Sequence, residues 1–97
     1  MFVEAPALAA QAAAESMGGA TTAATLAGTA PAMGAVVPMA GEEVSAMLAS
    51  AIAAHGAQFL AVGGLGVAQR AAFAATVATS GATYTAMDAV GKALLSL

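Results

Sequence analysis

The residues of this chain that could take part in acid–base chemistry are few and far apart. It has a single histidine, His55, and four glutamates that all lie outside the helical neighbourhood of that histidine. A catalytic histidine needs an orienting acid or a nucleophile within reach. Glu42 and Glu43 are adjacent and would point about 100° apart on a helix, which suits a solvated first turn better than a catalytic carboxylate pair. His55 could be a lone catalytic base, but a structural or interface role fits its place in an apolar stripe better.

Other ligand chemistries are also poorly supplied. The chain has no cysteine, which excludes disulfides and thiolate metal sites, and it has no glycine-rich phosphate loop or cluster of metal-ligating residues. The net charge is -3, and Arg70 and Lys92 are the two cations. Nucleic-acid binding needs clustered Lys and Arg. We therefore expect a protein that is not an enzyme, uses no cofactor or metal and binds no nucleic acid.

One pair of residues near the end of the sequence could act as a recognition mark. Tyr84 and Asp88 are four residues apart, so they share one face of a helix. A receptor could bury the ring and donate a charged hydrogen bond to the carboxylate. The alternative is that Tyr84 ends the apolar stripe and Asp88 is merely solvated.

The composition predicts helices with a meagre core. The 97 residues suffice for one small domain, and 61% of them are apolar, but 32 are alanine. Alanine is the best helix former and buries little surface. Such a chain is disposed to helix yet lacks large core residues. A partner protein could supply the missing side of the core.

The sequence predicts one helix over about residues 6–30 and a link over about residues 34–41. Pro6 suits a first helical turn, where its missing N–H costs nothing, and Glu4 places a negative charge at the positive end. Pro31 should kink or end this helix. Pro38 lies in the link between two glycines, and a short link favours antiparallel neighbours.

A second, much longer helix is predicted over about residues 42–91, a stretch without proline. Large apolar residues recur there at steps of three and four, as on one face of a helix. Fifty helical residues span roughly 75 Å, about twice the first helix, so the second helix must overhang it. The overhanging stripe cannot be buried within this chain, which also favours a partner.

A membrane span is the main rival interpretation. The window Val44–Val67 is long and apolar enough to cross a bilayer. Against a span, the window contains His55, Gln58 and four glycines, and its flanks lack the cations that set topology. We expect no signal peptide at the N-terminus, because it has no positive region and Glu4 and Glu15 interrupt its apolar stretch.

Three stretches together resemble the PE family of mycobacterial type VII secretion substrates. They are Phe-Val-Glu-Ala-Pro-Ala-Leu at 2–8, Val-Val-Pro-Met-Ala-Gly-Glu-Glu-Val-Ser-Ala at 36–46 with His55-Gly56 after it, and the Tyr-x-x-x-Asp pattern within 80–88. The sequence departs from the family at its namesake Pro-Glu pair, which reads Pro6-Ala7 here.

The resemblance implies an all-α fold, an antiparallel two-helix hairpin in a single domain over 1–97. The hairpin would complete a four-helix bundle with a PPE-family partner, as the PE subunit of a heterodimer. It also implies assembly in the cytoplasm, contact with an EspG-type chaperone through the PPE chain, and export to the medium or cell surface by the type VII (ESX) machinery. In this interpretation Tyr84 and Asp88 form the secretion motif.

The partner interface is predicted to use the large apolar residues of both helices, namely Leu26, Met33, Val44, Leu48, Ile52, Phe59, Val62, Phe73 and Val77. The alternative function is a membrane-active helical hairpin, such as a small pore former. Membrane association after export is compatible with either function.

Overall fold

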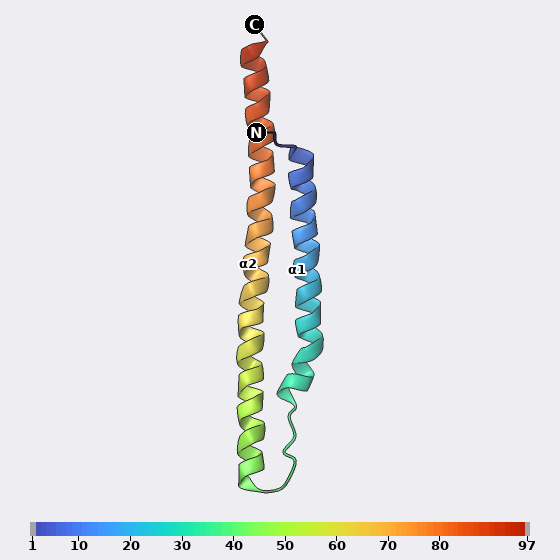
Figure 1. The fold of residues 1–97 in the computed structure, drawn as a ribbon, viewed down its shortest axis with the longest axis vertical. Helices are drawn as coiled ribbons and strands as arrows, with labels where there is room; N and C mark the ends of the chain where they lie inside the picture. Colours follow the sequence, from blue (N-terminus) through green and yellow to red (C-terminus); the bar gives the residue numbers. More distant parts are fainter. Residues whose placement is uncertain (1, 97) are drawn as a thin grey trace. The chain divides into compact units, whose positions relative to one another are not determined.

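The computed structural model describes residues 2–96 and contains two helices, α1 (Ala5–Gly34) and α2 (Glu43–Leu95), joined by a link over 35–42 (Figure 1). Within residues 2–96 there is no strand. The expected all-α class and the helical hairpin are therefore confirmed. The chain divides into two compact units, and each contains a segment of both helices. Unit 1 comprises the chain up to Gly19 and from Gln69 onward, and unit 2 is Ala20–Ala68.

The helices extend further than the sequence predicted. α1 ends at Gly34 rather than near residue 30, and Pro31 lies inside the helix. The helix continues past Pro31 because the proline carbonyl still accepts a hydrogen bond, from the Ala35 N–H at 3.0 Å. Figure 1 shows the last part of α1, drawn in teal, bent away from the preceding turns, as expected beside a proline. α2 ends at Leu95 rather than near residue 91.

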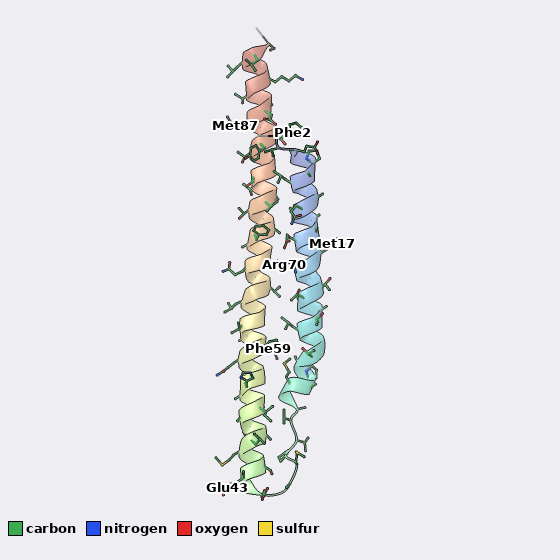
Figure 2. The ribbon with its side chains drawn as sticks, viewed as in Figure 1. Phe2, Met17, Glu43, Phe59, Arg70 and Met87 are labelled. Carbon is green, nitrogen blue, oxygen red and sulfur yellow. The ribbon has the colours of Figure 1, made fainter. Side chains whose placement is uncertain are left out.

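In unit 1 the two helix segments run antiparallel with small residues between them. Leu8 packs against Gly81, where a Cβ would lie 3.3 Å from that of Leu8. Further along α1, a Cβ on Gly18 would overlap the guanidinium of Arg70, which reaches across from α2 (Figure 2). The Arg70 Nε donates to Glu15 Oε2 at 2.8 Å. This partly exposed ion pair stabilises the hairpin by no more than about 1 kcal/mol.

Unit 2 repeats this arrangement with other residues. Leu26 of α1 lies against Gly63 of α2, where its Cδ1 would be 2.9 Å from an added Cβ. Met33 lies against Gly56, where an added Cβ would be 3.1 Å from the Met33 Cβ and 3.2 Å from its carbonyl oxygen. The large side chains of α1 thus contact glycines of α2, which lets the helix segments approach closely.

The buried residues of the described chain are all alanine or glycine. They are Ala12, Gly19, Ala49, Gly56, Ala74 and Gly81. We call the half-buried and buried positions between the helices the seam. Because apolar burial contributes about 25 cal/mol per Å², the fully buried part of the seam, which is alanine and glycine alone, stabilises the hairpin little.

Some glycines of α2 contact α1 and others have open space beside them, so the same substitution should have opposite effects at the two kinds of position. Gly56→Ala should destabilise the hairpin by about 1–2 kcal/mol, because its methyl group would meet the Met33 backbone, which cannot give way as a flexible side-chain tip can. Gly64→Ala should stabilise the hairpin by up to about 1 kcal/mol, since a Cβ there meets nothing within 4 Å and alanine favours helix. Thermal unfolding followed by far-UV circular dichroism should show shifts of opposite sign. A rise in both variants would contradict the close contact at Gly56.

Candidate interaction surface

Two stripes follow α2 and lie on different sides of the helix. The seam positions recur in alternating steps of three and four and face α1, and they include Gly56, Gly63 and Ala74. A second set of α2 positions, which includes Leu48 and Ile52, recurs at the same steps of three and four and forms the second stripe. At about 100° per residue, the centres of the two stripes lie about 100° apart around the helix. α2 therefore uses one face for its own chain and keeps a second face free.

The second stripe carries most of the residues that the sequence predicted for a partner interface. Those with exposed side chains are Val44, Leu48, Ile52, Phe59, Val62 and Phe73, between 47% and 72% exposed. These residues form a candidate interaction surface, and Met47 and Leu65 are also exposed on other sides of α2. α1 adds only Met17, which is 73% exposed and points away from α2 (Figure 2).

The other three predicted interface residues lie elsewhere. Leu26 and Met33 are half-buried against Gly63 and Gly56 of their own chain. Val77 is half-buried at a seam position of α2. The structure thus brings six of the predicted residues to the free face and three to the contact between the helices.

Two hollows in unit 2 lie where the free face meets the seam, because each is lined by residues of both stripes. One hollow, of about 200 Å³, lies between α2 and the link, and its residues are Val36, Val37, Pro38, Met39, Ser45, Leu48, Ala49 and Ile52. The next, of about 280 Å³, is lined by Met33, Ile52, His55, Gly56 and Phe59. The sequence did not predict that the link lines this hollow, because its proline and glycines indicate only a break between two helices.

His55 has no catalytic surroundings in this position. It is exposed and shares its hollow with apolar side chains and Gly56. The other ionisable side chains of Ala20–Ala68 are Glu42 and Glu43, three turns or more away along the chain. Among residues 2–96 no group of His, Asp and Glu could hold a metal ion. The location of His55 suits an interface residue.

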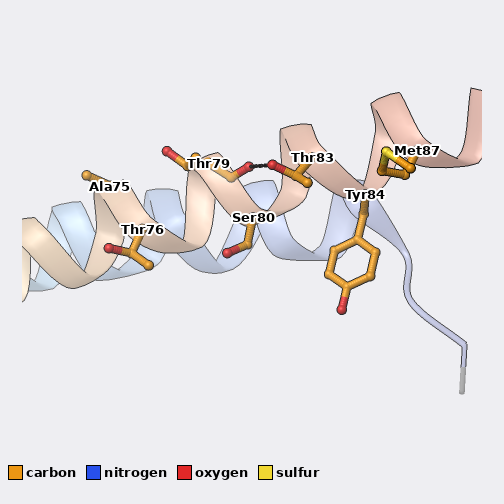
Figure 3. Close-up of a pocket in the computed structure, with 7 residues that line it drawn as sticks. All are labelled: Ala75, Thr76, Thr79, Ser80, Thr83, Tyr84 and Met87. Atoms are coloured by element: carbon orange, nitrogen blue, oxygen red, sulfur yellow. Dashed lines mark hydrogen bonds between the residues drawn. The ribbon is translucent and has the colours of Figure 1, made fainter.

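Tyr84 lies at the edge of a third hollow, on unit 1. This hollow has a volume of about 530 Å³, and its residues are Ala75, Thr76, Thr79, Ser80, Thr83, Tyr84 and Met87 (Figure 3). The Thr83 hydroxyl donates to the Thr79 carbonyl at 3.0 Å. Tyr84 is 38% exposed, and Asp88 is exposed one turn further on. The side chains of Tyr84 and Asp88 are therefore both accessible to a receptor.

Comparison with known proteins gives the family. Residues 1–91 match the sequence profile of the PE family. The chain belongs to the PE family. It is 39% identical over 82 residues to PE family protein PE13 of Mycobacterium tuberculosis (strain ATCC 25618 / H37Rv). These 82 residues are 84% of this chain and 82% of PE13. No solved structure matches the chain.

Membership of the PE family agrees with the chemistry of the surface. The PE family is non-enzymatic, in keeping with a histidine that lacks catalytic neighbours. The match includes Pro6-Ala7, so this PE protein departs from the namesake pair without leaving the family. The Glu4 carbonyl accepts hydrogen bonds from the N–H groups of Ala7 and Leu8 at 3.0 and 3.2 Å, so the helix start forms without an acid at position 7.

α2 is also long and apolar enough to contain a membrane span. By length and composition it could cross a bilayer, with a mean hydropathy of 1.4 over its apolar window and 6% of that window buried. The same exposed apolar face can thus serve a protein partner or a lipid environment.

Proposed function

We propose that this chain is the PE subunit of a PE–PPE heterodimer that is exported by a type VII (ESX) secretion system. The observation that carries the proposal is the free face of α2, where large apolar side chains such as Ile52 and Phe59 are about half exposed. A PPE-family chain would cover this face. The pair would assemble in the cytoplasm and meet an EspG-type chaperone through the PPE subunit.

The exposure of single side chains supports a partner. Val44, Leu48 and Val62 of α2 are 72%, 58% and 67% exposed. Large apolar groups exposed side by side are usually covered in a complex. Covering them would also supply the burial that the seam lacks.

The angle between the two faces of α2 supports a four-helix bundle. Each helix of such a bundle packs against two neighbours on faces roughly 90° apart. α2 has its seam on one face and the free apolar stripe about 100° around the helix. Two helices of the PPE chain could therefore complete the bundle, with Tyr84 and Asp88 beside it as the export mark.

Co-expression tests this function directly. The chain and the product of the adjacent gene, tested as the PPE partner, should elute without detergent as a soluble one-to-one complex after affinity capture and size-exclusion chromatography. The chain expressed alone should be insoluble or degraded, because its apolar face is uncovered. A chain that is soluble alone and ignores the PPE protein would contradict the proposal.

A membrane-active hairpin is the second candidate, favoured by the length and hydropathy of α2. The charge-free stretch between Glu43 and Arg70 would form the span. Its weak points are His55, Gln58 and the glycines, which insert poorly. Extraction of the singly expressed chain from membranes only with detergent would support this candidate.

A further inference from the structure

We propose that the link is part of the docking site, and that α2 and the link together form two consecutive holes for apolar side chains seven residues apart on one helix of the partner. This inference rests on the proposed PE–PPE pairing. It adds the element that the partner presents and assigns the link a role in recognition.

The first hole has the geometry of helix–helix packing. In coiled coils a side chain inserts among four residues of the facing helix at i, i+3, i+4 and i+7. The α2 residues of the 200 Å³ hollow are Ser45, Leu48, Ala49 and Ile52, which follow this spacing. The opposite wall is the link segment Val36–Met39.

The second hole repeats the pattern one heptad later. Its α2 residues are Ile52, His55, Gly56 and Phe59, again at i, i+3, i+4 and i+7. Met33 of α1 forms the other wall, and it lies close to α2 because Gly56 has no side chain. Ile52 belongs to both holes, so the two are continuous along the free face.

The spacing and charge of the holes define their occupant. Seven residues of helix rise about 10.5 Å, so a partner helix along α2 would fill both holes with side chains one heptad apart. From Val44 to Gln69 the chain carries no Asp, Glu, Lys or Arg. The inserted side chains should therefore be uncharged and bulky, such as leucine or methionine.

The link contributes exposed apolar groups to this site. Val37 is 79% exposed and Met39 is 97% exposed, although both line the first hole. A segment that only connected two helices could be polar at these positions, as most links are. The inserted side chain would cover them and join the link to the interface.

Single cysteines can map the docked face, because the natural chain has none. Maleimide labelling, read from the mass of this chain, would compare the native complex, formed with the co-expressed PPE protein, and the same complex after it has been dissociated in denaturant. Cysteines at Val37, Leu48 and Phe59 should lose labelling in the complex. Cysteines at Ala54 and Ala61, exposed on the other side of α2, should keep it.

The outcomes distinguish a failure of the docking site from a failure of the proposed PE–PPE pairing. If no complex forms with the natural chain, the proposed function fails. If a complex forms but Val37 stays reactive, or protection falls on Ala54 and Ala61, the pairing stands and the docking site is wrong.

A matched pair of variants in the link tests the same site by affinity. Met39→Asp should weaken the complex at least about tenfold, since it places a charge against the first hole. Ala40→Asp adds the same charge to an exposed neighbour that does not line the hole, and it should bind as the natural chain does. Equal affinities for both variants would overturn the role of the link.

Discussion

The Phe59→Asp variant should fail to form a complex with the PPE partner. Phe59 is 51% exposed in the hairpin and lines the second hole of α2, so the free chain tolerates the change. In the complex the carboxylate would be buried without a partner cation, which costs about 4 kcal/mol or more and lowers affinity at least about 1,000-fold. Affinity capture of the PPE protein from co-expressing cells should recover none of this variant.

Ala61→Asp is the matched control for Phe59→Asp. Residue 61 is exposed and lies two positions further along α2, roughly 160° around the helix from Phe59. The variant adds the same charge to the same helix, so it should bind the partner normally. If Phe59→Asp co-purified with the partner as well as Ala61→Asp does, Phe59 would not belong to the interface.

Tyr84→Ala should abolish export while leaving pairing intact. The ring is 38% exposed, and Asp88 is exposed on the same face, so the pair can be read by a receptor in the secretion machinery. Loss of the ring removes the apolar part of that mark. Immunoblots of culture medium should show no variant protein, and the cell lysate should contain the normal complex with PPE.

A control residue and the second half of the mark sharpen the export test. Thr79→Ala changes a residue of the same hollow and should be exported normally, whereas Asp88→Ala should reproduce the defect of Tyr84→Ala. Normal secretion of Tyr84→Ala would refute the secretion motif. Loss of pairing in that variant would instead show that Tyr84 belongs to the interface.

The helices and their break could be predicted from the residue types. Alanine content and the steps of three and four defined α1 and α2, and Pro38 with its flanking glycines defined the link. The end of α1 could not be predicted, because Pro31 removes a single donor and the helix continues to Gly34. Gly63, Gly64 and Gly66 do not break α2, and Gly63 gives room to Leu26.

The division of the apolar residues between two faces was harder to predict. Steps of three and four describe both the seam and the free stripe, so Leu26 and Met33 could not be told apart from Leu48 and Ile52 by periodicity. One signal was present: Leu26 and Met33 are seven residues apart in α1, and so are Gly63 and Gly56 in α2. Such matched intervals indicate large residues paired with glycines.

The small size of the fully buried residues, all alanine or glycine, also has a consequence for the amount of this protein in a cell. A hairpin held by so little buried surface opens easily, and open segments are cut by proteases in proportion to their population. Binding of a partner stabilises the closed form by mass action. The steady-state level of the chain should therefore follow the supply of its partner, and excess copies should be short-lived.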